Sequence, residues 1–314
     1  MLYWIRLLLV AASATFLTAC WDDSEDPPKN IVQVAQADPK FSVLVEAVTA
    51  ADLATTLSGT GPFTVFAPTN DAFTALLAEL GLTKDQLFAN KPLLTAVLQY
   101  HVLGAKVPKA SVPLGKAITP LAGGIFKIDA VGSGLVATDG RNRTSNITAT
   151  DVTASNGVIH VVDAVLLPAD KTVVETAIAL AGGNPAEFTV LVDAVVAAGL
   201  VDTLNGAGPF TVFAPTDAAF ANLLADLGMT KDQLLADTAL LTKVLTYHVV
   251  SGEVLKAEVP LNTPITTLEG ETFSVDANLA ITDQSGATAH ITATDVLASN
   301  GVIHVIDKVL LPTL

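Results

Sequence analysis

The histidines are the residues best suited to chemistry, and four of the five occur at equivalent places in two copies of one pattern. Tyr100–His101 matches Tyr247–His248, and His160 matches His304. A metal site would need further His, Cys or Asp ligands at close spacing, and the sequence has no such cluster. A catalytic histidine would need a nucleophile to orient, but the chain has one cysteine and no Gly-x-Ser-x-Gly motif. We therefore expect the Tyr-His pairs to be structural and to pin a helix to a sheet by hydrogen bonds.

One stretch occurs twice and sets the register of a long repeat. Phe63–Phe73 reads FTVFAPTNDAF, and Phe210–Phe220 reads FTVFAPTDAAF, 147 residues later (210 − 63). In each copy the alternating apolar residues predict a short strand that ends at a proline. The Thr-Asn or Thr-Asp pair that follows can cap a helix, whose apolar residues then recur at helical spacing. Each copy therefore predicts a strand, a tight corner and a helix with one buried face.

Each repeat changes from helical to strand patterns along the chain. Thr83–Gln86 and Thr230–Gln233 are capping boxes that begin short helices. After the Tyr-His pair, apolar runs separated by Pro and Gly predict strands, which in the first repeat are Ile125–Asp129, Leu135–Thr138, Ile147–Thr150 and Val158–Leu167. Here the repeat offset falls to 144 (292 − 148), so the second copy has lost three residues around Val131–Leu135, which indicates a surface hairpin. The pattern predicts an α+β fold in two domains.

The start of the chain resembles a secretion signal that ends in a lipid-attachment cysteine. The apolar run Leu7–Leu17 is too short to cross a bilayer and fits a signal-peptide core. Leu17–Cys20 reads Leu-Thr-Ala-Cys and resembles the lipobox of bacterial lipoproteins, which implies cleavage before Cys20 and acyl chains on it. The alternative is an ordinary signal peptide with an incidental cysteine. We expect residues 1–19 to be a lipoprotein signal peptide, 20–29 an acidic tether, 30–168 the first domain and 169–314 the second.

The chain is acidic, with a formal net charge of −15 at pH 7, and 51% of its residues are apolar. An acidic surface repels phosphate, so we expect no nucleic-acid partner. The apolar content is enough for a core in each domain, and a single cysteine excludes an internal disulfide. Arg141 and Arg143 form a basic loop in the first repeat, whereas the second repeat is strongly acidic. Contact between this loop and the second domain of another molecule would give weak, salt-dependent self-association.

Three ordered stretches in each repeat resemble the signature sequences of the fasciclin (FAS1) domain. They are the TVFAPT stretch, the Tyr-His pair, and the Asn-Gly-Val-Ile-His stretch that begins at Asn156 and again at Asn300. The resemblance covers nearly everything after the tether. It implies two FAS1 domains, each a β-wedge or sandwich with helices packed along one side. It also implies adhesion to a surface protein, matrix or polysaccharide, with no catalytic residue, no cofactor and no metal.

In animal adhesion members of this family, an Asp-Ile pair shortly before the Asn-Gly turn and the Tyr-His segment are assigned to receptor binding. The matching positions here are Asp151 and Val152 in the first repeat, and Asp295 and Val296 in the second, so valine replaces isoleucine in both. The resemblance makes these four residues candidate adhesion residues. The alternative is that each aspartate accepts hydrogen bonds from nearby N–H groups in a turn or at a strand edge.

The sequence leaves two functions open. The first is a non-enzymatic adhesion or binding protein of the cell envelope, held by the lipid on Cys20 and facing the periplasm or the outer surface. The alternative is a carrier or sensor of a small apolar ligand such as a carotenoid, which some fasciclin-like proteins bind. The identity of the ligand, the choice between inner and outer membrane and the oligomeric state are left open as well.

Overall fold

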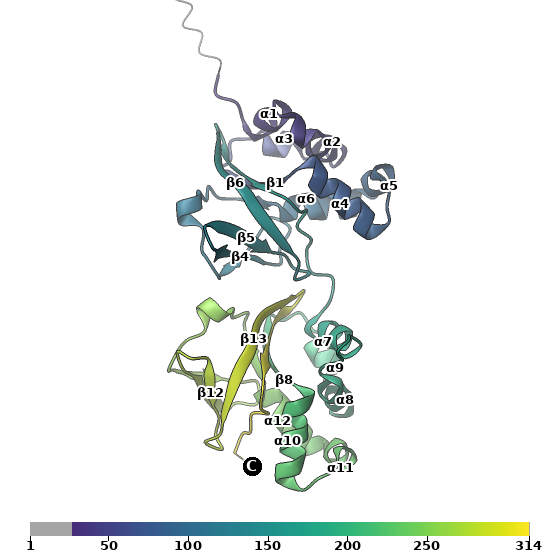
Figure 1. Ribbon diagram of the computed structural model, residues 1–314, viewed down its shortest axis with the longest axis vertical. Coiled ribbons are helices and arrows are strands. Elements are labelled where there is room, and N and C mark those ends of the chain that lie inside the picture. Colours follow the sequence, from purple (N-terminus) through teal and green to yellow (C-terminus); the bar gives the residue numbers. More distant parts are fainter. Residues whose placement is uncertain (1–26, 314) are drawn as a thin grey trace, which may run out of the picture.

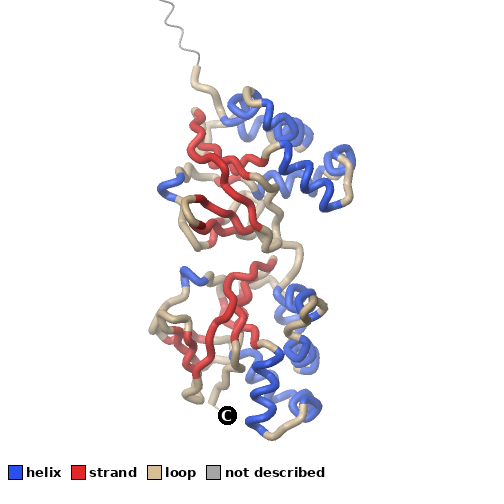
Figure 2. The backbone as a smooth tube through the Cα atoms, viewed as in Figure 1, coloured by secondary structure: helices blue, strands red, loops and turns tan. Residues whose placement is uncertain are grey.

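The computed structural model describes residues 27–313 and shows two similar halves stacked end to end (Figure 1). In each half the α-helices lie on one side, and the strands lie on the other together with one short 3-10 helix (Figure 2). Residues 163–172 connect the halves. The predicted α+β fold is therefore confirmed for both repeats. No helix among the described residues is both long and apolar enough to span a bilayer. Cys20, the predicted lipid-attachment residue, lies outside the described residues.

The helical layer of the first half begins directly after Asn30. The Asn30 side chain accepts the Gln33 N–H and the Gln33 side chain accepts the Asn30 N–H, which closes a capping box. The predicted cap of the central helix is confirmed, because the Thr69 hydroxyl accepts the Ala72 N–H at 3.3 Å. Gly81 ends that helix at φ 63°. The helical elements are α1 (Ile31–Gln36), η1 (Pro39–Phe41), α2 (Ser42–Ala50), α3 (Ala54–Leu57), α4 (Asn70–Leu80), α5 (Lys84–Ala89), α6 (Lys91–Tyr100) and η2 (Lys109–Ser111).

The strands of the first half form one sheet with the order β2-β1-β7-β6-β5-β4-β3. β1 and β7 pair in parallel, next to the edge strand β2, and the other neighbours are antiparallel. β1 and β7 are buried along nearly their whole length, as strands are when both faces of a sheet are covered. The strands are β1 (Phe63–Pro68), β2 (Val102–Leu103), β3 (Ala117–Ile118), β4 (Phe126–Val131), β5 (Gly134–Thr138), β6 (Thr144–Ala154) and β7 (Gly157–Val162).

The side chains of β1 enter two separate cores. Val65 and Ala67 face the helices, whereas Phe66 points to the opposite face, because alternate residues of a strand point to opposite sides. The Phe66 ring packs edge to face on the Phe126 ring, with centroids 5.2 Å apart. β1 and β4 are separated by three strands of the same sheet, so this contact requires the sheet to fold over the second core. The fold is thus a wedge of curled sheet with helices along one side.

The second half repeats this plan with the sheet order β10-β11-β12-β13-β14-β8-β9. Its shorter β11–β12 hairpin accounts for the three residues predicted to be lost. The elements are α7 (Val173–Ala181), α8 (Thr189–Ala197), α9 (Val201–Leu204), β8 (Phe210–Pro215), α10 (Asp217–Leu227), α11 (Lys231–Ala236), α12 (Thr238–Tyr247), β9 (Val249–Ser251), η3 (Lys256–Glu258), β10 (Pro264–Thr266), β11 (Thr272–Val275), β12 (Ala280–Thr282), β13 (Thr288–Ala298) and β14 (Gly301–Ile306).

One predicted strand is too long. The apolar run Val158–Leu167 predicted a single strand, but β7 ends at Val162. Past Asp163, the backbone N–H groups of Ala164, Leu166 and Leu167 donate to side chains instead of a neighbouring strand, and that of Leu166 donates to the His101 ring. The residues after β7 are still buried, which is why hydrophobicity alone did not show where the strand ends.

Candidate functional site

The Tyr-His pair of the first domain joins the end of α6 to the sheet and to the segment after β7. The Tyr100 hydroxyl donates to the Ile125 carbonyl oxygen. His101 Nδ1 lies 2.7 Å from the Val97 carbonyl oxygen, and its Nε2 accepts the Leu166 N–H at 2.9 Å. These partners assign the ring proton to Nδ1. Burial lowers the pKa of His101 to about 4, so the ring is neutral at physiological pH.

The second domain repeats these contacts. His248 Nδ1 lies 2.7 Å from the Val244 carbonyl oxygen, and Nε2 accepts the Leu310 N–H at 2.9 Å. The Tyr247 hydroxyl donates to the Thr272 carbonyl oxygen at 2.8 Å. Burial lowers the pKa of His248 to about 4 and raises that of Tyr247 to about 12. In both domains the tyrosine hydroxyl and both histidine ring nitrogens have hydrogen-bond partners inside the fold.

The second histidine of each domain holds a bulge that projects an aspartate. The pairing of β6 with β7 shifts register twice between Ile147 and Val152, and Asp151 in the bulge has φ 60°. The Asp151 N–H donates to His160 Nδ1 at 3.3 Å. His160 Nε2 in turn lies 2.9 Å from the Val107 carbonyl oxygen, to which it donates. The bulge therefore turns the Asp151 side chain away from the sheet, which gives His160 a role that the sequence had not shown.

The second domain has the same bulge. Asp295 has φ 61°, its N–H donates to His304 Nδ1 at 3.3 Å, and His304 Nε2 lies 2.9 Å from the Val254 carbonyl oxygen. Burial keeps the pKa of His304 below its usual range. One carboxylate oxygen of Asp295 accepts the Lys256 N–H at 2.7 Å, as Asp151 accepts the Lys109 N–H at 2.8 Å. Histidine and aspartate are nine residues apart in both copies, and this constant spacing is the sequence signal that could have linked them.

The two copies differ in what meets the aspartate. Lys127, on β4 of the first domain, places Nζ 2.8 Å from the free carboxylate oxygen of Asp295 and 3.1 Å from Asp129. The Lys127 side chain is 13% exposed and that of Asp295 is 3% exposed. Burial opposes the charge on Lys127, but the hydrogen bonds and charges of Asp295 and Asp129 outweigh it and raise the pKa of Lys127. The pair is thus a charged and largely buried contact between the domains.

A second polar contact reaches the same strand. The side-chain amide of Asn142, on the β5–β6 loop, donates to the Leu297 carbonyl oxygen at 3.0 Å and accepts the Leu297 N–H at 2.7 Å. Asn142 adopts φ 61°, and glycine occupies the equivalent place in the second domain, where Gly286 has φ 77°. Asparagine tolerates this left-handed conformation better than most residues. The loop is therefore shaped to aim an amide at the β13 edge.

Apolar side chains close the contact between the domains. Ile125 of the first domain packs in one buried cluster with Leu255, Leu297 and Val302 of the second. Leu255 and Leu297 are 0% and 1% exposed. We call these contacts the joint: Ile125, Lys127 and Asn142 of the first domain against Leu255, Asp295 and Leu297 of the second.

The candidate adhesion residues therefore lie in two different environments. Asp295 is 5% exposed within the joint, so its carboxylate is not available to an outside receptor. Asp151 is exposed, and Val152 beside it is 36% exposed. We call the open surface the Asp151 face, which consists of Pro108, Lys109, Asp151, Val152 and Thr153. We call its equivalent the Asp295 face, which consists of Leu255, Lys256, Asp295, Val296 and Leu297, and whose Leu255, Asp295 and Leu297 are covered by the joint.

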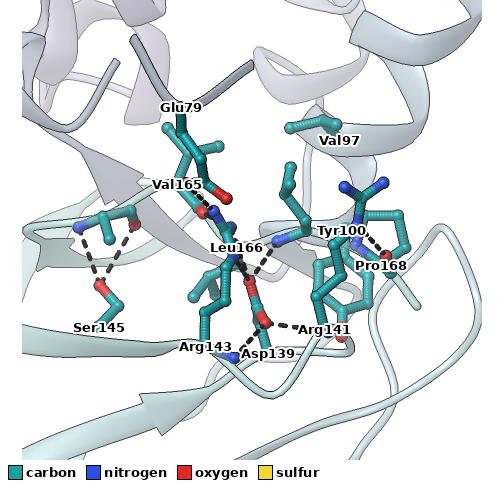
Figure 3. A network of polar contacts seen from close by, with 12 residues as sticks. Glu79, Val97, Tyr100, Asp139, Arg141, Arg143, Ser145, Val165, Leu166 and Pro168 are labelled. Atoms are coloured by element: carbon teal, nitrogen blue, oxygen red, sulfur yellow. Dashed lines mark hydrogen bonds and ion pairs between the residues drawn. The ribbon is translucent and has the colours of Figure 1, made fainter. Parts of the chain in front are cut away.

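The basic loop of the first domain is held by ion pairs within the chain. Arg143 donates through Nε and Nη2 to the buried Asp139 carboxylate at 3.0 and 2.8 Å, and through Nη1 to Glu79 at 2.7 Å (Figure 3). Arg141 pairs with Asp170 of the connecting segment at 3.0 Å. Both arginines thus have intramolecular partners, and self-association through this loop stays a prediction.

Small apolar cavities lie between the helices and the sheets and, in the second domain, among the helices α10, α11 and α12. Those found among residues 27–313 have volumes of about 30 Å³ in the first domain and about 50 and 90 Å³ in the second. Ligand pockets are usually about 300–1,000 Å³ in volume. A carotenoid would have to part the helices from the sheet, so these cavities are not preformed sites for it. The carrier alternative stays a prediction.

Comparison with known proteins shows a family match over most of the chain. The family model described as "Fasciclin domain" matches residues 39–168 and 186–312. Protein sll1483 of Synechocystis is 46% identical over 148 residues, which cover 46% of this chain and 76% of that protein. Immunogenic protein MPB70 of Mycobacterium bovis is 38% identical over 144 residues, which cover 43% of this chain and 68% of that protein.

Similarity across both domains extends to larger proteins. Transforming growth factor-beta-induced protein ig-h3 of Oryctolagus cuniculus is 30% identical over 258 residues, which cover 82% of this chain and 35% of that protein. The chain thus spans about a third of the length of that relative. A solved FAS1 domain pair from the insect cell adhesion molecule Fasciclin I has a TM-score of 0.42 at 18% identity, covering 86% of this chain and 95% of that structure.

Proposed function

The chain belongs to the fasciclin domain family, and from this premise we propose that it is a non-enzymatic adhesion or binding protein that meets a partner in the cell envelope through the Asp151 face. The observation that carries the proposal is the exposed Asp151 carboxylate on a bulge held by His160. A bulge of this kind re-aims one side chain and commonly lies next to a functional site. His101, His248 and His304 are buried and bond to backbone groups. The exposed His290 lies 3.2 Å from the Asp307 carboxylate, and surface contact accounts for the whole arrangement better than catalysis does.

The Asp151 face lies at the end of the molecule where the chain enters the first domain. The Ser155 N–H, directly after β6, donates to the Lys29 carbonyl oxygen at 2.9 Å, and the chain enters the first domain there (Figure 1). Residues 20–29 can span at most about 30 Å when fully extended. With acyl chains on Cys20, the Asp151 face would lie within that distance of a membrane. The partner is then a protein or polysaccharide close to the membrane that holds the anchor.

The anchor can be tested separately from the contact. Cells that produce the chain are labelled with a radioactive or clickable fatty acid and fractionated, alongside cells that produce Cys20→Ser. We expect label and membrane association for the unaltered chain, and neither for the variant. Unlabelled protein released from the cells would rule out the lipid anchor and leave the contact proposal standing.

Contact through the Asp151 face is tested on intact cells with a photo-crosslinking residue at Val152. The matched control places the same residue at Val296, which holds the equivalent position on the covered Asp295 face. We expect a defined adduct from Val152 and none from Val296. The absence of an adduct at Val152, or equal adducts at both positions, would contradict the proposed function.

A further inference from the structure

The two faces are built from equivalent residues on equivalent strands. Thr153 lies opposite Val158 in the first sheet as Leu297 lies opposite Val302 in the second. β5 and β12 pair with only the earlier part of β6 and β13, so the later part of each long strand has no further strand on its outer side. In both copies a bulge aspartate therefore stands at the start of an open strand edge, where unpaired peptide groups can accept a partner.

The joint shows which groups bind such an edge. The Lys127 ammonium lies 2.8 Å from the Asp295 carboxylate, and the Asn142 amide bonds both peptide groups of Leu297 at 2.7 and 3.0 Å. The first domain thus binds the Asp295 carboxylate with one ammonium and the edge of β13 with one side-chain amide, and neighbouring parts of one sheet carry both groups.

The same groups are open in the first domain. One Asp151 carboxylate oxygen accepts the Lys109 N–H, and the other has no partner at hydrogen-bonding distance among residues 27–313. Thr153 holds the position in β6 that Leu297 holds in β13. Its pair with Val158 is the second pair after the turn, which is a non-hydrogen-bonded pair of the ladder, so the Thr153 N–H and C=O point away from β7 to the open side. The first domain therefore has an equivalent carboxylate, that of Asp151, and an equivalent strand edge at Thr153, and no other domain among the described residues covers them.

We propose that the Asp151 face docks a protein that presents a lysine beside a side-chain amide, as Lys127 and Asn142 are presented at the joint. This rests on the proposed function, since it names the chemistry of the partner for the same surface. The ammonium pairs with the Asp151 carboxylate, and the amide bonds the peptide groups of Thr153. Main-chain bonds of this kind give affinity at a strand edge, and the charge pair fixes register.

The apolar positions of the Asp151 face indicate reversible docking. Leu255 and Leu297, which are buried in the joint, correspond to Pro108 and Thr153. Exposed leucines would form an apolar patch that favours permanent cover, whereas proline and threonine remain soluble when the face is empty. The Asp151 face can therefore bind a partner and also remain exposed to solvent without aggregating when the partner is absent.

A second copy of this chain does not present the required groups. At the free end of the second domain, Ser274 holds the position of Lys127, Gly286 that of Asn142, and Thr272 that of Ile125. This difference supplies a test made from the chain itself. The variant Thr272→Ile/Ser274→Lys/Gly286→Asn, the graft, copies the docking residues of the joint onto the free end.

Sedimentation of the purified chain measures the result. We expect the graft to associate head to tail, so that its weight-average mass rises with concentration, because a heterologous contact that does not close extends into chains. Adding Asp151→Asn to the graft should weaken this association about tenfold, as loss of a charge-assisted bond does. The matched control adds Asp202→Asn, which neutralises an exposed aspartate elsewhere on the second domain and should leave the association unchanged.

Two sedimentation results would overturn the proposal. One is a folded graft that sediments like the unaltered chain, and the other is an association that is equally strong in the Asp151→Asn and Asp202→Asn variants of the graft. If the triple variant does not fold, Ser274→Lys/Gly286→Asn carries the same test with Thr272 in place. A third result would also overturn the proposal: an adduct at Val152 on cells in which the crosslinked partner resists proteases, as a polysaccharide would. That result would leave the proposed function intact. A graft that associates through Asp151, with no adduct on cells, supports the docking chemistry and contradicts the proposed function.

Discussion

The Asp151 face and the Asp295 face have the same local construction and opposite exposure. Each has a bulge aspartate at positive φ, a histidine nine residues later that accepts its N–H, and a lysine N–H on its carboxylate. Asp295 is 5% exposed because the first domain covers it, whereas Asp151 has no such neighbour among the described residues. The same bulge, with its aspartate and histidine, is thus part of the joint in the second domain and part of an open surface in the first, depending on the position of the domain within the pair.

This difference also shows how the copies have diverged. The contacts inside each domain, such as the Tyr-His pair and the helix caps, are the same in both. The residues of the joint are among those that differ: Ser274 and Gly286 stand where the first domain has Lys127 and Asn142, and Thr153 stands where the second has Leu297. The two faces therefore differ in the residues that make the contact.

The largest predicted effect tests the part that the domains share. The pKa values of His101 and His248 are about 4 in the folded chain, against about 6.5 when unfolded. Between these values the unfolded state binds more protons, so stability is intact above pH 6.5 and is lost as pH falls toward 4. The loss is about 3 kcal/mol of unfolding free energy for each histidine. Urea unfolding from pH 7.5 to 4 measures it.

A double variant separates these histidines from other titrating groups. His101→Gln/His248→Gln should be less stable than the unaltered chain at pH 7.5, because the amide fits the two hydrogen bonds less well, but its stability should fall less steeply with acid. Residual slope is expected from buried His304. A pH slope as steep as that of the unaltered chain would show that another group causes the acid sensitivity.

The next effect sets the two aspartates directly against each other. Asp295→Asn removes one of the two carboxylates that pair with the largely buried Lys127 ammonium and leaves only Asp129. It should cost about 2–4 kcal/mol of unfolding free energy. Asp151→Asn changes an exposed group and should cost less than about 1 kcal/mol. Thermal and urea unfolding of the matched variants give the comparison. Equal losses would mean that the joint does not distinguish the two faces in solution.

A smaller effect is expected at the loop that carries the amide. Asn142→Gly removes two hydrogen bonds to Leu297 but keeps a residue that tolerates positive φ, so it should weaken the joint by about 1–2 kcal/mol. The reverse change, Gly286→Asn, lies at the free end and should alter stability by less than about 0.5 kcal/mol. A loss from Gly286→Asn that matches the loss from Asn142→Gly would point to strain in the loop rather than to the joint.

The sequence was sufficient for features that depend on local spacing. The Thr69 cap, the glycine end of α4, the capping box at Thr83 and the hairpin that lost three residues all follow from short patterns, and the structure contains each of them. The end of β7 was not predictable in this way, because the segment after it stays buried while its N–H groups bond to side chains far away in the sequence.

The joint could not be predicted, since its partners are far apart and ordinary in type. Lys127 and Asp295 are separated by 168 residues, and a lysine on an alternating strand usually indicates a solvent-exposed position. Asn142 is a loop residue whose role depends on the backbone of another domain. Resemblance to the family pointed to both bulge aspartates equally, and only the arrangement of the domains separates Asp151 from Asp295.

Amide hydrogen exchange at Leu297 and Thr153 tests this separation most directly. Both amides lie at the same register position on the outer edge of a long strand, but that of Leu297 donates to Asn142 within the joint. In the unaltered chain we expect Leu297 to exchange about tenfold to a hundredfold more slowly than Thr153, and Asn142→Gly to remove most of the difference. Equal exchange at the two positions would show that the joint is open in solution, and would contradict the account of one covered and one free face.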